Sequence, residues 1–407
     1  MADNQPRDFD MVLGGEAAPP VTGIVLGGLE GVKSRLNSSI ANVQTAALCD
    51  ALNYGDAGLD LVIETLPNFS RQVQRFAKRL LKQEGGAQGK QALLDYNPML
   101  FFTKLEDWDV KQFDPNADIV SPSEKAYSVN LEKLKLFFNS KNIYKIEALI
   151  CHLPENYSYK VSGFYDFINL LADNCQNLIN LKALFIGDER ENQYRKSRVR
   201  IGDINLILES CPNLEVLQIR GYCDELECSV LRHDNLKTLI IETASISDIA
   251  VEMMCSLNLP ALEYFELWMG SKYKLNLSKV IKNIKPVLFS ESFPNLRYLG
   301  IRSCEYADEI AAAIAQSYFI AESPIVDNLS VLDLSMGNLT DEGLKVLLDC
   351  PAIQNLHTLN ISNNCVSEEF FEQMEQLSPP DCLLIKDFQE PIIQRNVGIS
   401  RYYALYE

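Results

Sequence analysis

The sequence predicts an α/β solenoid whose parallel sheet lines a concave side, preceded by a small all-α region. Two observations carry this prediction. From residue 146 to residue 385 a short leucine pattern recurs, with helical patterns between its copies. From residue 28 to residue 96 the chain instead carries amphipathic helical patterns that end at glycines.

Composition and charge narrow the class of protein. The chain has 407 residues, of which 47% are hydrophobic and 23% are charged, as in an ordinary globular protein. It lacks an apolar run of about 18 residues, so no membrane span is predicted, and its start, MADNQPRDFD, is unlike a secretion signal. The net charge of −18 disfavours nucleic acid and anionic lipid as partners. We therefore expect a cytoplasmic location.

Eleven cysteines occur without any C-x-x-C pair, which predicts free thiols in a reducing compartment. Three of them, Cys175, Cys211 and Cys350, each lie just before a predicted leucine strand. We interpret these as small apolar side chains at helix ends, with a catalytic or redox role as the alternative. The histidines, at positions 152, 233 and 357, lack the spacing of a zinc site, so neither a metal nor a cofactor is expected.

Residues 1–27 are expected to form a flexible N-terminal segment, and residues 28–96 form the predicted helical region. Within it, SIANVQTAALCDALNYG and FSRQVQRFAKRLLKQEGG align with an offset of 30 residues, so that Val43, Ala47 and Ala51 match positions 73, 77 and 81. Paired helices at this spacing resemble HEAT repeats of the short, phycobilisome-lyase-like type. The resemblance implies stacked helix pairs that serve as an adhesive surface.

One of these helices carries a row of basic side chains at helical spacing: Arg71, Arg75, Lys78, Arg79 and Lys82. This secondary basic face is a candidate grip for an acidic partner, or for an acidic patch of the chain's own second half. The alternative is an ordinary solvated helix face.

The stretch EGGAQGKQALL suggests a phosphate loop at first sight. Gly85 and Gly89 are one residue too close for that motif, and Gln91 replaces the hydroxyl residue that would meet Mg²⁺. We expect these glycines to serve turns or helix caps instead.

Residues 97–145 are predicted to cap the open end of the solenoid, which would otherwise expose core. An aromatic cluster of Phe101, Phe102 and Trp108 lies near their start, and the amphipathic NLEKLKLFFNSK follows. We expect Phe101 and Trp108 to be core, and KAYSV to be a first strand.

The repeat itself reads leucine, two residues, leucine or phenylalanine, one residue, isoleucine or leucine. Its leading apolar residues fall at 146, 181, 214, 236, 262, 296, 329 and 356, in steps of 22 to 35 residues. A single strand and helix of this length cannot bury their own apolar faces, so neighbouring copies must stack.

Residues 146–385 therefore resemble the leucine-rich-repeat family, in its ribonuclease-inhibitor-like class with long helical repeats. That family places Asn or Cys eight positions after the first leucine, where it bonds backbone in the turn. Here only Cys304 and Asn364 fit, so we expect irregular turns, with extra loops such as the one after Ile186.

Side chains alternate along a strand, so inward Leu262, Phe265 and Leu267 place Tyr264 and Trp268 on the concave face. The same phase gives three outward columns. The first is Ala183, Val216, Thr238, Tyr264, Tyr298, Val331 and Thr358. The second is Phe185, Gln218, Ile240, Glu266, Gly300, Asp333 and Asn360. The third is Gly187, Arg220, Glu242, Trp268, Arg302, Ser335 and Ser362.

The middle of these columns is the predicted partner-binding patch, because it is rich in the aromatic and arginine side chains that dominate binding hot spots. Its residues are Tyr264, Trp268, Tyr298, Arg220, Arg302, Ile240, Glu266 and Phe185. The alternative is that a flanking loop or the C-terminal tail covers Tyr264 and Trp268. Gly300 is expected to leave a dent that a partner side chain could enter.

The tail, residues 386–407, follows a last strand at Leu383 to Ile385. Its tyrosines Tyr402, Tyr403 and Tyr406 either fold over the final repeat or form a free peptide for a partner.

The sequence favours a non-enzymatic protein-interaction module: an adaptor, a scaffold or an assembly factor that binds a protein or peptide. No nucleophile motif, metal set or phosphate loop is found, and Asp188, Glu189 and Glu191 of GDERE read as solvated. No small-molecule substrate is expected. Two alternatives remain open. One, taken from the HEAT resemblance, is a chromophore lyase-like protein or chaperone of a light-harvesting complex such as the phycobilisome; the other is a structural subunit of a large complex.

Overall fold

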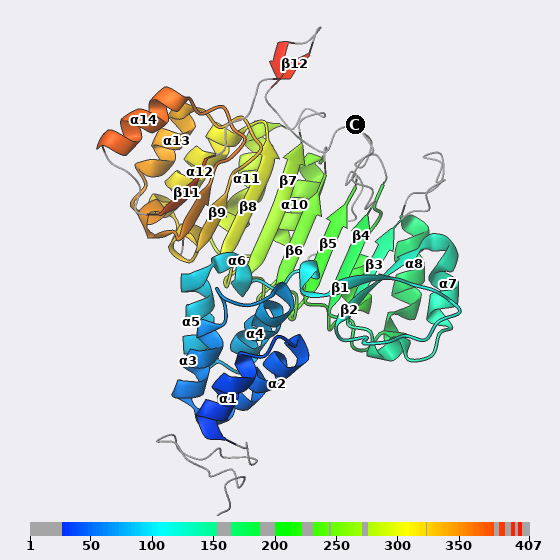
Figure 1. The fold of residues 1–407 in the computed structure, drawn as a ribbon. Coiled ribbons are helices and arrows are strands. Elements are labelled where there is room, and N and C mark those ends of the chain that lie inside the picture. The colour runs from blue at the N-terminus through cyan, green and yellow to red at the C-terminus, as the bar shows by residue number, and fades with distance from the viewer. Residues whose placement is uncertain are drawn as a thin grey trace, which may run out of the picture. The chain divides into compact units, whose positions relative to one another are not determined.

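The computed structural model describes residues 27–152, 164–187, 200–221, 231–243, 246–270, 276–322, 324–377, 382–386, 392–394 and 398–400. The chain divides into two compact units, residues 1–101 and 102–407 (Figure 1). The GDERE loop beyond Gly187, the tail tyrosines and residues 1–26 lie outside the described residues.

The described part of the first unit is helical. Its elements are α1 (Gly28–Leu36), α2 (Ala41–Ala51), the 3₁₀ turn η1 (Leu52–Tyr54), α3 (Asp56–Glu64), α4 (Arg71–Gln83), α5 (Gly86–Tyr96) and α6 (Pro98–Phe101). Apolar residues at helical spacing, such as Val73, Ala77 and Leu81 of α4, are fully buried. The same face of α2 buries Ala47 and Ala51.

The 30-residue offset seen in the sequence has a structural counterpart. Gln44 Nε2 donates to the carbonyl oxygen of Leu36 at 3.0 Å, and Gln74 Nε2 donates to that of Leu66 at 2.5 Å. Both donor and acceptor are displaced by 30 residues. Leu36 is the last residue of α1 and Leu66 lies two residues beyond α3, so each bond ties the start of one helix to the place where the helix before it ends.

Glycines in this unit let helices approach closely. A Cβ on Gly58 would lie 1.7 Å from the carbonyl oxygen of Ala51, and a Cβ on Gly89 would lie 2.8 Å from that of Leu81. The Gly85 N–H donates to the same Leu81 oxygen at 3.1 Å and so helps to end α4. Gly85 of EGGAQGK thus helps to end α4, which is the turn or cap role expected for these glycines. Gly89 instead allows a close contact between two helices.

The second unit is built on one eleven-stranded sheet with the strands in chain order, β1 to β11, every neighbouring pair parallel. The strands are β1 (Asp109–Gln112), β2 (Lys125–Asn130), β3 (Ala148–His152), β4 (Ala183–Gly187), β5 (Val216–Arg220), β6 (Thr238–Glu242), β7 (Tyr264–Gly270), β8 (Tyr298–Cys304), β9 (Val331–Asp333), β10 (Thr358–Asn360) and β11 (Leu383–Ile385). This architecture fits the predicted α/β solenoid.

Helices join the strands and are α7 (Leu131–Phe138), α8 (Tyr165–Asn174), α9 (Asn205–Ser210), α10 (Asp248–Ser256), α11 (Leu277–Leu288), α12 (Ala307–Ile320), α13 (Asp341–Leu348) and α14 (Glu368–Leu377) (Figure 1). Short 3₁₀ turns are η2 (Leu105–Asp107), η3 (Ile143–Lys145), η4 (Cys175–Asn177), η5 (Ile325–Asp327) and η6 (Pro351–Asn355). A separate hairpin pairs β12 (Ile392–Gln394) with β13 (Gly398–Ser400). KAYSV is confirmed as a strand, β2, whereas β1 was not predicted.

The register confirms the predicted side-chain phase. Tyr264 pairs with Thr238 and Tyr298, and Glu266 pairs with Ile240 and Gly300. The inward row is buried throughout and consists of Leu184, Leu217, Leu239, Phe265, Leu299, Leu332 and Leu359. These residues form the core between sheet and helices, so the second face of each strand is turned to the concave side.

An asparagine ladder fixes where strands begin. Asn180 Nδ2 donates to the carbonyl oxygen of Tyr144 at 2.7 Å, and Asn213 Nδ2 to that of Ile179 at 3.0 Å. Asn235 donates to Pro212 at 2.9 Å and Asn295 to Pro260 at 2.7 Å. Each acceptor lies in the preceding repeat, one residue before the equivalent position. The ladder therefore ties consecutive repeats together at the amino-terminal rim of the sheet.

Asn364 occupies the turn after its strand, as the resemblance implies. Its Oδ1 accepts from the N–H groups of Gly337 and Leu339, and its Nδ2 donates to the carbonyl oxygens of Leu334 and Ile361. The buried amide thus satisfies four backbone groups of the turn.

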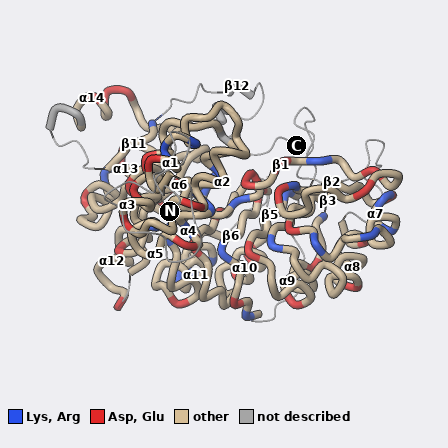
Figure 2. Tube along the Cα trace, turned by 60° about the horizontal axis from the view of Figure 1, so that its bottom comes forward, with Lys and Arg blue, Asp and Glu red and all other residues tan. Residues whose placement is uncertain are grey.

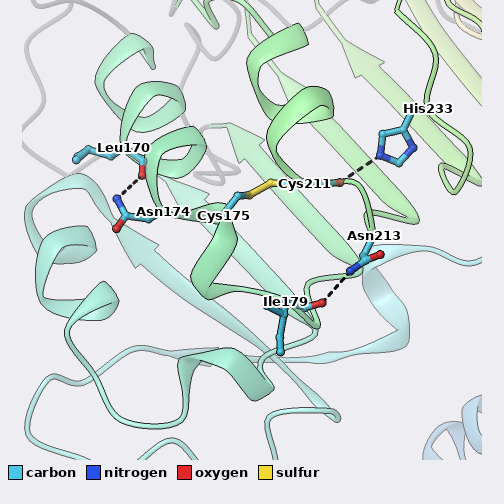
Figure 3. The surroundings of a disulfide bond; sticks show 7 residues. All are labelled: Leu170, Asn174, Cys175, Ile179, Cys211, Asn213 and His233. Atoms are coloured by element: carbon cyan, nitrogen blue, oxygen red, sulfur yellow. Dashed lines mark hydrogen bonds between the residues drawn. A yellow bond between two sulfur atoms is a disulfide. The ribbon is translucent and has the colours of Figure 1, made fainter.

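The expectation of free thiols is wrong for one pair. Cys175 and Cys211 form a disulfide between adjacent repeats, with a Cα–Cα distance of 5.6 Å (Figure 3). The helix-end position expected for them is what brings them together, because consecutive repeats stack their helix ends. Cys350 is a buried free thiol. Disulfides persist mainly in oxidising compartments, so this bond does not support the predicted cytoplasmic location. That location stays a prediction.

Candidate protein-binding face

A short segment of the chain crosses the concave face. We call residues 102–108 the strap. Phe102 is fully buried and contacts Tyr264 and Tyr298 edge to face, with centroid distances of 5.2 and 5.9 Å. The Thr238 hydroxyl donates to the carbonyl oxygen of Thr103 at 2.5 Å. Lys104 Nζ lies 4.5 Å from the centroid of the Tyr264 ring.

The other end of the strap is anchored by Trp108. This indole is buried in an apolar cluster on the outward face of strands β2 to β5, whose members are Ala126, Ala148, Ile150, Ala183, Phe185 and Val216. Leu105 packs against the same cluster. Phe101 and Trp108 are both buried, as predicted for them.

The strap corrects the predicted patch. Tyr264 and Tyr298 are each only 2% exposed, and Ile240, Glu266 and Phe185 are also buried. The cover over the two tyrosines comes from the strap, whereas the predicted alternative expected a flanking loop or the C-terminal tail. Arg220, Trp268 and Arg302 keep partly exposed side chains. A binding role remains a prediction for these three.

Gly300 does not leave a dent. A Cβ placed on it would lie 2.9 Å from Tyr298 Cε1 and 3.2 Å from Glu266 Cγ. The Tyr298 ring therefore occupies the space that the glycine vacates. The glycine serves packing within the sheet face, and the expectation of an entry point for a partner is wrong.

Glu266 organises the centre of the face. Its Oε2 accepts from the Tyr264 hydroxyl at 2.5 Å, while its Oε1 accepts from Trp268 Nε1 at 2.7 Å and from Arg302 Nη1 at 2.8 Å. The Tyr298 hydroxyl lies 3.4 Å from Oε2. A buried carboxylate needs such a complete set of donors, because its hydration has been lost.

The electrostatics keep Glu266 ionised. Burial by itself would raise the pKa of this carboxyl, but Arg302 and the hydrogen bonds from Trp268 and Tyr264 hold the pKa below its ordinary value. Burial, and then the neighbouring carboxylates, place the pKa values of Tyr264 and Tyr298 well above the ordinary value. At neutral pH the cluster therefore combines a carboxylate, protonated phenols and a guanidinium.

Asp333 extends the network toward the last repeats. Its Oδ2 accepts from the Tyr298 hydroxyl and from Asn360 Nδ2, both at 2.9 Å. Arg302 Nε donates to Ser335 Oγ at 3.0 Å and lies 3.6 Å from Asp333 Oδ1. Arg302 is thereby fixed from two strands.

A second ion pair lies two strands away on the other side. Arg220 Nε donates to Glu242 Oε2, and Gln218 Nε2 donates to Glu242 Oε1 at 3.1 Å. The Arg220 guanidinium also lies 5.7 Å from the centroid of the Phe185 ring. Arg220 is therefore held by both charge and ring contact.

The partly exposed members of the predicted patch form a row, which we call the ledge: Arg220, Trp268 and Arg302. They come from β5, β7 and β8, and the Arg302 guanidinium lies 5.1 Å from the centroid of the Trp268 ring. The ledge presents cationic and aromatic side chains that are already oriented by buried carboxylates. Such an arrangement can hold a partner group without first ordering its own side chains.

The predicted basic face of α4 is more buried than an ordinary solvated helix face would be. Lys78 is only 5% exposed, and Arg75, Arg79 and Lys82 are partly buried. Lys82 Nζ donates to the carbonyl oxygen of Phe101 at 2.7 Å and lies over the Phe101 ring. The side chain of Arg71 lies outside the described residues.

Charge is unevenly distributed over the solenoid. Residues 303–377 hold thirteen Asp and Glu against one Lys, a net charge of −12 out of −18 for the chain. Figure 2 shows acidic positions on α12, α13 and α14. Asp308 and Asp341, in the first turns of α12 and α13, accept from Thr340 and Ser367 of the next repeat. These two carboxylates therefore have a structural role.

The described residues contain no group of three or more His, Cys, Asp and Glu placed to hold a metal ion. None of their helices is long and apolar enough to cross a membrane.

Comparisons with known proteins agree with this architecture. Residues 328–348, which include β9 and α13, match the family model described as Leucine Rich repeat. The crystal structure of a Bacteroides fragilis protein, a structural genomics target, is similar with a TM-score of 0.52 and 22% sequence identity, covering 72% of this chain and 76% of that one. At that identity the likeness shows the fold alone. A search of curated proteins finds no match. Together the parallel sheet, the repeat match and the structural likeness support a leucine-rich-repeat protein.

Proposed function

We propose that the chain is a non-enzymatic protein-interaction module that binds a protein partner through the ledge. The observation that carries this proposal is the partly exposed Trp268 indole, which lies under the Arg302 guanidinium and donates to the buried Glu266. Leucine-rich repeats generally mediate protein–protein contacts, and the family match supports that class of function.

The ledge has the side chains that dominate binding energies. Truncating a buried tryptophan or arginine anchor in an interface costs about 2 kcal/mol or more. Arg302 is 22% exposed and its position is set by Glu266 and Ser335, so little rotamer entropy is lost when a partner covers it. The mixture of arginine, glutamate and indole fits a polar peptide surface better than a uniformly charged one.

The experiment compares three forms of the full chain as bait in native extract: wild type, Trp268→Ala and Ile249→Ala. Ile249 is exposed on α10, away from the concave side, and serves as the matched control. We expect one partner to be recovered in fixed ratio with wild type and Ile249→Ala, and to be lost with Trp268→Ala although that variant still unfolds in a cooperative transition. Recovery of the same proteins by all three baits would refute the assignment of the ledge.

The 30-residue offset of Gln44 and Gln74 supports a further proposal, that residues 28–96 are HEAT-like helix pairs with an adhesive role of their own. The light-harvesting lyase or chaperone and the structural subunit rest on resemblance or composition alone, so we do not propose them.

A further inference from the structure

The outward row beneath the strap is graded in size. It begins with alanine on β2, β3 and β4, at Ala126, Ala148 and Ala183, and ends with tyrosine on β7 and β8. The small end receives the bulky Trp108, and the large end receives Phe102, which packs edge to face against the stacked pair of phenol rings. The row is thus complementary to two aromatic side chains that are six residues apart.

We propose that this row is a peptide-binding trough, with the strap as its present occupant. The ligand class is a short peptide that carries aromatic side chains at positions i and i+6 and makes one 3₁₀ turn between them. This site is separate from the ledge, and the proposal does not depend on the function assigned to the ledge.

The strap packs on a face of the sheet that is separate from the core of the solenoid, as a bound ligand would. The core of the solenoid lies between the sheet and the helices, and the apolar residues around Trp108 form a cluster of their own on the other face. Within the strap, η2 provides the turn, and the Lys104 N–H donates to Asp107 Oδ2 at 3.2 Å. Glu106, at the middle of the turn, is exposed. This hydrogen bond within the strap contributes to the stability of the turn.

The fit of the strap is incomplete in one respect. Trp108 Nε1 and Ser128 Oγ are both buried and have no hydrogen-bond partner among the described residues. A buried polar group without a partner costs about 1–3 kcal/mol. Ser128 belongs to β2 and not to the strap, so a peptide that offers a donor or an acceptor to Ser128 Oγ would gain that free energy relative to the strap. The trough can therefore accept other members of the same chemical class.

The test uses the full chain with Phe102→Ala and Trp108→Ala, which empties the trough. The probe is a labelled peptide with the sequence of residues 100–110, and the control peptide has alanine in place of both aromatics. We expect the probe to bind the double variant one to one, at least about tenfold tighter than the control peptide, and to raise its melting temperature. Wild type should bind neither peptide because its trough is filled.

Three results would overturn the proposal. A folded double variant that binds both peptides equally, or neither, would show that the row has no recognition of its own. Loss of a cooperative transition in the double variant and in Phe102→Ala alone would show that the strap is core. Loss of probe binding on adding Trp268→Ala to the double variant would show that the probe occupies the ledge.

Discussion

The rings of Tyr264 and Tyr298 stack in parallel across two neighbouring strands, with 3.8 Å between centroids and 10° between planes. Their hydroxyl groups meet the same Glu266 carboxylate, at 2.5 and 3.4 Å. Equivalent residues of consecutive repeats thus share one acceptor. The two rings contact each other, and their hydroxyl groups contact the same carboxylate. The arrangement of the cluster therefore depends on Glu266.

Replacing Glu266 by alanine should destabilise the second unit strongly. The change leaves the Arg302 guanidinium and the Tyr264 hydroxyl without their shared acceptor, and breaking a buried pair in this way costs about 3–5 kcal/mol. Denaturant unfolding measures the loss. Glu252→Ala, at an exposed position of α10, is the control and should change the unfolding free energy little. Equal effects of the two substitutions would contradict the role of Glu266.

Replacing Gly300 by alanine should displace the Tyr298 ring, because the new methyl group would lie 2.9 Å from its Cε1. Overpacking of this kind costs about 1–3 kcal/mol. The near-ultraviolet circular dichroism of the stacked tyrosines should change at the same time. In a Tyr298→Ala background the same methyl should cost less, and a double-mutant cycle measures that coupling. Additive effects would show that the ring does not fill this space.

Acid should destabilise the protein through His233. Its Nδ1 accepts from the N–H of Leu236 at 3.0 Å, so Nε2 carries the proton and donates to the carbonyl oxygen of Cys211 at 3.2 Å. Burial lowers the pKa of this imidazole below its ordinary value of 6.5, although the Cys211 carbonyl and Asp234 act in the opposite direction. The unfolded chain therefore takes up a proton first, and stability falls as the pH decreases from 6.5 through the folded pKa.

Unfolding free energies across this pH range, compared between wild type and His233→Gln, measure the effect. The glutamine variant should lose less stability than wild type between pH 6.5 and pH 5. Parallel pH profiles for the two proteins would exclude the histidine as the source.

Reduction of the Cys175–Cys211 disulfide should lower stability. The bond joins residues 36 positions apart, and closing a loop of that length stabilises the folded state by about 4 kcal/mol in the chain-entropy account. The denaturant midpoint of wild type should therefore fall on adding a reducing agent. The double variant Cys175→Ser, Cys211→Ser should start at the lower midpoint and not respond. A midpoint of wild type that ignores the reductant would contradict the bond.

In the first unit, Gly58→Ala should be more damaging than Gly89→Ala. The added Cβ at position 58 would lie 1.7 Å from a backbone oxygen, against 2.8 Å at position 89, and backbone cannot move aside as a side chain can. We expect Gly58→Ala to lower the free energy of unfolding by at least about 2 kcal/mol. Thermal unfolding monitored by the helical circular dichroism signal measures this loss. Ala57→Ser, at the exposed neighbouring position, is the control. The reverse order would mean that the close helix contact is not formed at Gly58.

The sheet could be predicted because leucines at fixed spacing determine which side of each strand is buried. The three outward columns follow directly from that alternation, and the register of Tyr264 with Tyr298 confirms it. The polar strand β1 was missed because DVKQ has no apolar alternation. The disulfide was missed because sequence spacing alone does not show which helix ends meet.

The strap could not be predicted because its contacts are distant in sequence and follow no period. Thr103 meets Thr238 across 135 residues. The signal available was the aromatic cluster of Phe101, Phe102 and Trp108, which predicts burial but not its location. For this reason the sequence predicts that Tyr264 and Tyr298 belong to a binding surface, although they are buried, and only the ledge of the predicted patch is partly exposed.

The bonds of the asparagine ladder keep nearly the same length although the repeats that they join differ in length. Asn235 bonds to Pro212 across 23 residues and Asn295 bonds to Pro260 across 35 residues, yet the two bonds differ by only 0.2 Å, at 2.9 and 2.7 Å. Additional residues in a long repeat are thus accommodated away from the ladder. In the long repeat these residues include the whole of α11 (Leu277–Leu288), so a repeat of this scaffold can lengthen by a helix while the bond at its start keeps its length.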